Sequence, residues 1–351
     1  MAEFRVNSIT NQDGSAGPQV CGVSTFSGKS GVQIPSGSFH FRRQDGSGRG
    51  RAIHAGGDTY QSRMEFHSIT SGGGGTDFGD LSVALDRPHG CSNSTRGIFA
   101  GGKKSPGVEI DTIEYVTISS SGGVNDFGDL LEDVANGDAA SNETRGIISA
   151  GYDAPTNINT IQFINMASTG NARDFGDGLE NRGQQCISST TRYVSAGGYG
   201  SPNYDGSGSY AYLNIIDFLT FSTKGNPKDF GDLSVAAYGA AGGTSSSTRG
   251  IFANLSVSPG TRQNIIEFVT IATTGNTTDF GDMTTARAGG GTGNSTRGIF
   301  MGGSTNPSGS ATNIIDFISI ASTGDAKDFG DLLFAGRYAS TISDSHGGLS
   351  Q

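Results

Sequence analysis

Short apolar segments recur along the chain and are separated by stretches rich in Gly, Ser, Asn and Asp. One kind of segment reads STRGIFAGG (94–102) or STRGIFMGG (295–303), and a second reads NIIEFVTIA (264–272) or NIIDFISIA (313–321). The second kind is apolar almost throughout instead of alternating with polar residues, which indicates strands covered on both faces. The pattern therefore predicts short β-strands in sheets that are stacked face to face.

A four-residue motif, Asp-Phe-Gly-Asp, marks the period of the repeat. Its copies are 49, 48, 55, 50 and 49 residues apart and start at Asp77, Asp126, Asp174, Asp229, Asp279 and Asp328. The first three letters also occur in protein kinases as a magnesium-binding signature, but the Lys-bearing strand, catalytic loop and helical lobe of a kinase have no counterpart here. No catalytic site needs six copies of one metal ligand, so the motif indicates architecture.

The spacing within each unit shows where the chain keeps its register. An acidic or amide residue lies twelve residues before each motif, at Glu65, Glu114, Gln162, Asp217, Glu267 and Asp316. The distance to this residue from the preceding repeat arginine varies instead, being 14, 18, 17, 25, 18 and 19 residues. One connection therefore absorbs the insertions, and in repeat proteins such insertions map to loops on one face.

These observations predict an all-β chain in two parts. Residues 49–351 are expected to form a six-bladed β-propeller, because a period of about 50 residues with roughly four short strands fits a propeller blade. The fourth strand is expected in segments such as SVAAYGAAGGTSSS (234–247), and the ring is expected to close by pairing of residues 334–346 with residues 51–56. Residues 1–48 lack the repeat and are expected to form a short β-rich attachment segment.

Composition excludes several classes of protein. There are 58 Gly and no Trp among 351 residues, and Lys and Glu are scarce, so long helices are not expected. The net charge of -10 argues against binding to nucleic acid. No apolar run approaches the roughly 20 residues of a membrane span, and the N-terminus lacks the apolar core of a signal peptide. The three cysteines, at 21, 91 and 186, are expected to be free thiols.

Two sets of recurrent residues are expected to hold the blades together. The repeat arginines are Arg51, Arg96, Arg145, Arg192, Arg249 and Arg297, and the motif phenylalanines are Phe78, Phe127, Phe175, Phe230, Phe280 and Phe329. Each guanidinium is expected to pair with a carboxylate; the alternative is an arginine ring that binds an anion. Each Phe is expected to pack between blades, with its Gly in a tight turn that the first Asp caps. Calcium is the alternative for the motif, but we assign no metal and no cofactor.

The longest variable loop, YGSPNYDGSGSYAYLN (199–214), is the candidate binding site. It carries Tyr199, Tyr204, Tyr210 and Tyr212 among Gly and Ser, a composition that gives binding loops contact area at low entropic cost. The alternative is a surface insertion that packs on itself. No catalytic residue is assigned, so the chain is interpreted as non-enzymatic; Glu132 and Asp133, acidic residues peculiar to one unit, are the only hints of a glycoside-active enzyme.

The order of the motifs is similar to that of a divergent kelch propeller, with Phe-Gly-Asp-Leu where kelch repeats have Trp-x-x-Leu. The whole chain resembles virion structural proteins of tailed bacteriophages, notably those of aquatic bacteria and cyanobacteria, in TNQDGSAGPQV (10–20), GVSTFSG (22–28), GRGR (48–51) and IIDFISIASTGDAKDFGDL (314–332). This resemblance implies a tail-fibre or capsid-associated protein in the virion, made in the host cytoplasm. It also implies attachment to other virion proteins through residues 1–48, a homo-oligomer within the particle, and binding of a host-surface glycan or protein, with capsid decoration as the alternative.

Overall fold

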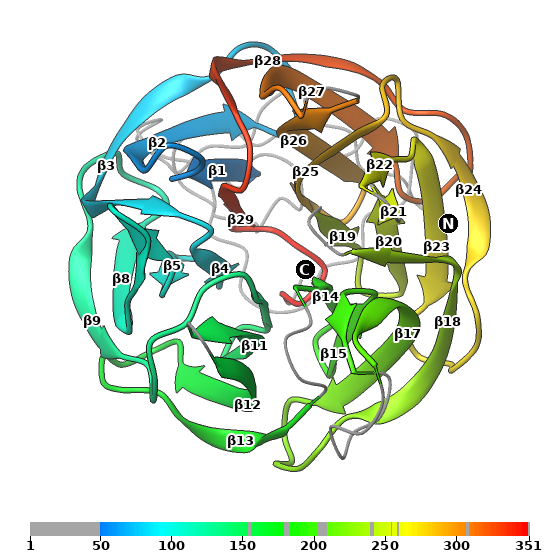
Figure 1. Cartoon of the computed structure of the whole chain (residues 1–351). Coiled ribbons are helices and arrows are strands. Elements are labelled where there is room, and N and C mark those ends of the chain that lie inside the picture. Colours follow the sequence, from blue (N-terminus) through cyan, green and yellow to red (C-terminus); the bar gives the residue numbers. More distant parts are fainter. Residues whose placement is uncertain are drawn as a thin grey trace, which may run out of the picture. The chain divides into compact units, whose positions relative to one another are not determined.

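The computed structural model describes residues 50–153, 156–178, 183–201, 209–238, 242–253, 255–257, 260–306 and 309–349. The attachment segment 1–48 and Tyr204 lie outside these residues. The described residues form an all-β structure, and they contain no helix long and apolar enough to cross a membrane. The sheets are arranged around a common centre as a β-propeller, as Figure 1 shows.

The strands of the described residues form six sheets, which we number in chain order. Sheet one contains β29 (Ser340–Ser343), β1 (Arg51–Ala55), β2 (Gln61–Ser68) and β3 (Thr76–Asp86), and sheet two contains β4 (His89–Ser92), β5 (Arg96–Ala100), β8 (Thr112–Thr117) and β9 (Asn125–Asp129). Sheet three contains β10 (Asp138–Ser141), β11 (Arg145–Asp153), β12 (Thr156–Asn165) and β13 (Arg173–Asp177), and sheet four contains β14 (Gln185–Ser188), β15 (Arg192–Ala196), β17 (Ala211–Thr220) and β18 (Lys228–Tyr238). Sheet five contains β19 (Gly243–Ser245), β20 (Arg249–Ala253), β23 (Ile265–Thr270) and β24 (Thr278–Asp282), and sheet six contains β25 (Arg287–Gly293), β26 (Arg297–Thr305), β27 (Thr312–Ser319) and β28 (Lys327–Gly336).

Short hairpins extend two of the sheets. β6 (Lys103–Lys104) and β7 (Val108–Glu109) add to the outer edge of sheet one, and β21 (Ser256–Val257) and β22 (Thr261–Arg262) add to sheet four. β16 (Tyr199–Gly200) pairs with β17. Each of these strands comes from the loop between the second and third strands of a sheet, which is the connection where the sequence places its insertions.

The four main strands of each sheet are antiparallel neighbours, and the chain then crosses to the innermost strand of the next sheet. Residues 234–247 divide accordingly: 234–238 complete the outer strand β18, and 243–245 form the inner strand β19 of sheet five. The expectation that they form one strand is therefore wrong. Residues 334–336 similarly end β28, and residues 340–343 pair with 52–55 of β1, from Ser340 beside Ala55 to Ser343 beside Ala52. Sheet one thus takes its innermost strand from the end of the chain (Figure 1).

The DFGD motif is a β-bulge in the outer strand and not a turn. In sheet five, Glu267 pairs with Asp279 and Ile266 pairs with Gly281, so that Phe280 has no partner across the strand pair. The glycine takes φ 146°, a conformation that suits Gly at a bulge. The first Asp is an exposed strand residue opposite the acidic position, and this cross-strand pairing explains the constant spacing of twelve residues.

Backbone hydrogen bonds at these bulges connect neighbouring sheets. The carbonyl of each motif Phe accepts a bond of 2.7–3.2 Å from a Gly N–H in the turn before the next motif: Gly122 to Phe78, Gly170 to Phe127, Gly225 to Phe175, Gly275 to Phe230, Gly324 to Phe280 and Gly73 to Phe329. The last of these bonds joins sheet six to sheet one. The rings of the six Phe are buried and pack edge to face on an aromatic ring of the third strand, as Phe280 does on Phe268.

The repeat arginines also join neighbouring sheets, but not through carboxylates. Each donates from Nη1 to a carbonyl of the next sheet: Arg51 to Ile118, Arg96 to Met166, Arg145 to Phe221, Arg192 to Ile271, Arg249 to Ile320 and Arg297 to Ile69. Each guanidinium also stacks on an aromatic ring of its own sheet, as Arg249 does on Phe268 at 4.5 Å. The expected pairing with carboxylates is therefore wrong: the acceptor in each case is the carbonyl of the residue that follows the third strand of the neighbouring sheet.

The acidic positions make a third set of contacts between sheets. Five of the six accept a hydrogen bond from the residue five after the start of the preceding motif: Glu65 from Leu333 N, Glu114 from Ser82, Gln162 from Leu131 N, Glu267 from Ser234 and Asp316 from Thr284. Asp316 also pairs with Arg287 at 2.6 Å, and both side chains are fully buried. These buried carboxylates are thus stabilised mainly by N–H and O–H donors.

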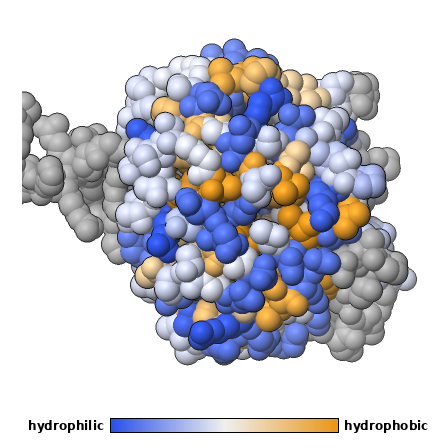
Figure 2. Space-filling model, turned by 90° about the vertical axis from the view of Figure 1, so that its left-hand side faces the viewer, coloured by the Kyte–Doolittle hydropathy of each residue, from blue (hydrophilic) through white to orange (hydrophobic). Residues whose placement is uncertain are grey.

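The outer side of the ring carries several exposed apolar side chains. Val83, Leu131, Leu333 and Phe334 are 42–54% exposed, and each lies five or six residues after the start of a motif. Figure 2 shows one side of the ring, where hydrophobic residues lie in separate groups among hydrophilic ones. Scattered exposed apolar residues of this kind are common on protein surfaces and need no special role.

Candidate binding site at the mouth of the central channel

The innermost strands of the sheets surround a central channel with two unlike ends. Because neighbouring strands are antiparallel, the loops between second and third strands lie at the same end as the connectors between sheets. We call this end the loop face. The opposite end, the tail face, carries the short turns before each repeat Arg and residues 344–349 of the C-terminus, which reach the centre of the ring (Figure 1).

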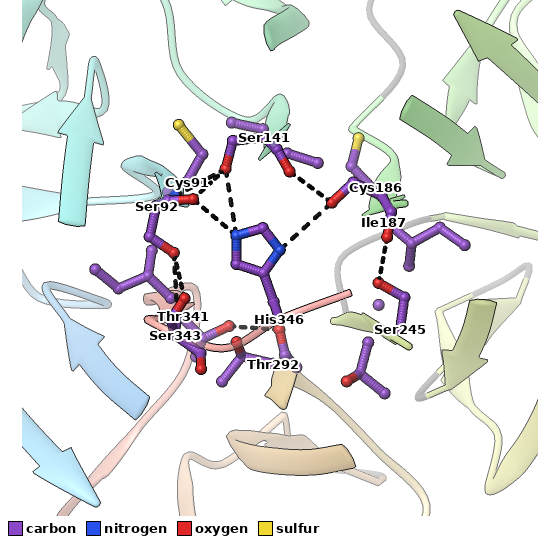
Figure 3. Close-up of a pocket in the computed structure, with 18 of the residues that line it drawn as sticks. Cys91, Ser92, Ser141, Cys186, Ile187, Ser245, Thr292, Thr341, Ser343 and His346 are labelled. Atoms are coloured by element: carbon purple, nitrogen blue, oxygen red, sulfur yellow. Dashed lines mark hydrogen bonds between the residues drawn. The ribbon is translucent and has the colours of Figure 1, made fainter. Parts of the chain in front are cut away.

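The C-terminal residues close the channel at the tail face. Figure 3 shows the His346 ring in the middle of a cavity of about 50 Å³ that the inner strands line. Its Nε2 lies 2.7 Å from the Ser92 carbonyl, and the Gly348 N–H donates to Nδ1 at 3.1 Å. The proton therefore lies on Nε2. Burial lowers the pKa of His346, which favours this neutral form, and Leu349 beyond it is buried.

The loop face leaves the channel open as a cavity of about 120 Å³. Its wall comes from the connectors that precede the inner strands, including Arg87, Asn136, Gln184 and Tyr338, and from glycine-rich backbone at 242–243 and 289–291. Side chains on one part of the wall and bare backbone on the other make a concave polar surface. Such a surface is suited to a ligand with several hydrogen-bonding groups.

Four connectors place a left-handed residue at the same point of this mouth, two residues before an inner strand. These residues are Tyr338 (φ 59°), Arg87 (φ 54°), Asn136 (φ 67°) and Gly183 (φ 42°). Three of them are not glycine, although a left-handed side-chain residue costs on the order of 1–2 kcal/mol. Backbone strain of this kind clusters at functional sites, so the position favours a role for the side chains themselves.

Arg87 and Tyr338 form one side of the mouth. The guanidinium lies 4.2 Å from the centre of the Tyr338 ring, and the Arg87 N–H donates to the Tyr338 carbonyl at 3.0 Å. Its Nη1 is 3.5 Å from Asp86 Oδ2, and its buried Nε–H has no hydrogen-bond partner. Nearby, the hydroxyl of Ser340 is also buried without a partner. Two residues that line the mouth therefore carry buried donors without a partner.

Asp138 follows the neighbouring connector, at the start of β10, and backbone N–H groups occupy both of its carboxyl oxygens. Its Oδ1 accepts from Ala139 N at 2.8 Å and its Oδ2 from Cys186 N at 2.7 Å. Burial raises the pKa of Asp138 to about 7, so the carboxyl carries little charge below neutral pH. The Cys186 thiol, which forms no disulfide, lies 2.7 Å from the buried Tyr193 hydroxyl. This side of the mouth is thus rigid and nearly uncharged.

The tyrosines of the variable loop lie beside the mouth. Tyr199 packs on Tyr210 and Tyr212, with ring centres 5.9 and 5.7 Å apart, and Tyr212 packs on Tyr238 at 6.3 Å. The Tyr238 hydroxyl donates to Asn136 Oδ1 at 2.8 Å. The structure therefore brings Tyr199, Tyr210 and Tyr212 together and connects them through Tyr238 to the channel, with Tyr199 39% exposed.

The other candidate residues are not among those that line the mouth. The repeat arginines and motif phenylalanines lie at the junctions between sheets, and Glu132 and Asp133 lie in the connector between sheets two and three. Among the described residues no group of three or more His, Cys, Asp or Glu side chains is suited to hold a metal ion. Sequence reasoning missed Arg87, Asn136 and Tyr338, because only the structure shows that their connectors meet.

Comparison with known proteins does not assign the chain to a family. A search with protein-family models finds no match, and a search of curated proteins finds none. Any function proposed for the chain therefore rests on the geometry of the mouth and on the sequence motifs.

Proposed function

We propose that the protein is a non-enzymatic virion structural protein of a tailed bacteriophage and that it binds a host-surface glycan at the loop face. The observation that carries this proposal is the mouth, where three strained non-glycine residues lie beside packed tyrosines. Aromatic rings supply apolar contact area and Arg, Asn and Gln supply directed hydrogen bonds, which together suit a polar ligand with apolar patches. The resemblance to virion proteins favours a tail fibre or another displayed protein as the carrier of such a site.

Gly50 and Arg51 lie at the tail face. The Gly50 and Arg51 N–H groups donate to Asp344 Oδ1 at 2.7 and 3.1 Å, so the chain enters the ring at the tail face. The proposal takes the loop face as the end that receives the external ligand. In the same proposal the six sheets are six kelch-like blades, and the pairing of β29 with β1 closes the ring.

The test is binding of the full chain to host cells and to an array of bacterial surface glycans. We expect Tyr199→Ala and Tyr212→Ala to weaken binding at least tenfold, because both remove contact area next to the mouth. Phe334→Ala is the matched control, since Phe334 is an exposed aromatic on the outer side of the ring. Binding that all three variants retain would contradict the proposal.

Capsid decoration is the second candidate, favoured by the polar turns that repeat on the tail face and could contact a regular lattice. It predicts binding to assembled capsids through the tail face, unaffected by the tyrosine variants. Cryo-electron microscopy of the particle would separate the two functions, because it would show whether the loop face points outward and how many copies assemble.

A further inference from the structure

Arg87 is the charged group of the mouth that retains hydrogen-bonding capacity. The other charged residue of the wall, Asp138, has both carboxyl oxygens occupied by backbone N–H groups. The Arg87 guanidinium is held in place by the Tyr338 ring and by the left-handed backbone, while its Nε–H has no partner and its Nη1 is only 3.5 Å from Asp86. The Nε and Nη2 edge is the one that bonds a carboxylate with two parallel N–H groups.

The size and the remaining donors of the mouth limit the ligand further. A cavity of about 120 Å³ is slightly smaller than one that holds a benzene molecule, so it takes one end of a sugar unit and not a whole chain. The Ser340 hydroxyl is a second donor without a partner. A group with several acceptor oxygens in a small volume, such as a carboxylate, matches these two unused donors and the Arg87 guanidinium, which Asp86 approaches only to 3.5 Å.

We propose that the mouth binds the carboxylate of a uronic acid unit in a surface polysaccharide. Arg87 bonds the carboxylate, Ser340 supplies a further donor after a small shift, and the neighbouring sugar unit lies on Tyr238 and Tyr212. This inference rests on the proposed function, since it names the class of glycan that the loop face selects. It also gives a reason why the strained position two residues before the inner strand carries Arg in one connector, although Gly183 shows that glycine fits the same position in another.

The experiment compares charged and neutral forms of the same sugars with the full chain. Binding of trigalacturonate and of oligomers of glucuronate and mannuronate is measured by titration calorimetry, each beside its methyl ester, which has the same shape without the charge. We expect at least one acid to bind tenfold or more tightly than its ester. Arg87→Gln is expected to abolish this difference, whereas Arg63→Gln, a guanidinium stacked on Phe334 at the outer side of the ring, is expected to leave it unchanged.

Arg87→Gly separates binding from folding, because glycine relieves the left-handed strain while it removes the guanidinium. We expect its melting temperature to stay close to that of the wild type and its preference for the acid to disappear. Equal binding of acid and ester, or no binding of any acid oligomer by a chain that still binds host cells, would overturn the uronate proposal and leave the proposed function standing. If the wild-type protein binds neither host cells nor any glycan, the proposed function and the uronate proposal are both overturned.

Discussion

His54 should make the protein sensitive to acid at the junction of its first and last sheets. It lies three residues after a repeat arginine, at the position that Phe99, Phe252 and Phe300 occupy in sheets two, five and six. It is 7% exposed, and its strand partner is Glu65, which bonds Leu333 of sheet six. An ionisable side chain thus stands where four of the other five sheets have an apolar one and sheet four has Ser195.

The size of the stability change follows from the pKa of His54. Burial lowers this pKa from 6.5 to about 4, and the smaller effect of the Glu65 charge opposes the shift. Because the folded pKa lies below the unfolded one, protonation favours unfolding, and stability falls as the pH decreases from 6.5 to about 4. A difference of about 2.5 pKa units corresponds to about 3 kcal/mol, most of which is lost by pH 4.5. Above pH 7 the side chain is neutral in both states and contributes no pH dependence.

Replacement by leucine, which has a similar size and no charge, tests this reasoning. We expect His54→Leu to differ from the wild type by less than about 1 kcal/mol at pH 7.5 and to be more stable by about 2 kcal/mol at pH 4.5. Urea unfolding followed by circular dichroism measures both, since the chain has no Trp. Ile148→Leu at the equivalent position of sheet three is the control and should follow the wild-type pH profile. An equal effect of His54→Leu at both pH values would refute the assignment of acid sensitivity to this side chain.

Three further predictions concern stability. Phe280→Ala should destabilise the protein by about 3–5 kcal/mol, because it empties a buried ring site between sheets; a calorimetric shift near zero would contradict this. Arg249→Gln should cost about 2 kcal/mol, since it removes the bond to Ile320 and the stacking on Phe268, and the same substitution at exposed Arg63 is the control in chemical unfolding. Asp138→Asn should gain stability relative to the wild type as the pH rises from 4 to 7, because the raised pKa makes ionisation of the folded carboxyl unfavourable; equal stability differences from the wild type at pH 5 and 8 would argue against it.

Much of the candidate site lay beyond prediction from sequence. The tyrosine loop was identifiable because it is the longest insertion of a repeat, and the structure places three of its tyrosines together. Arg87, Asn136 and Tyr338 carry no motif, and their equivalence depends on where each inner strand begins. Those starts are not marked in the sequence, because inner strands are short, rich in small residues and different in every sheet.

The all-β propeller and the register within each sheet could be predicted from the order of residues alone. The motif and the acidic position pair directly across two adjacent strands, and the turn between these strands has the same length in every unit. The connection that varies could be predicted in the same way. The contacts between sheets could not be predicted, because their partners lie far apart in the chain. The carbonyl of Ile320 that accepts from Arg249, for example, is about 70 residues away. Residues 87, 136 and 338 meet at one mouth only in the folded ring, since contacts between distant connectors depend on the curvature of the whole ring and not on any local pattern.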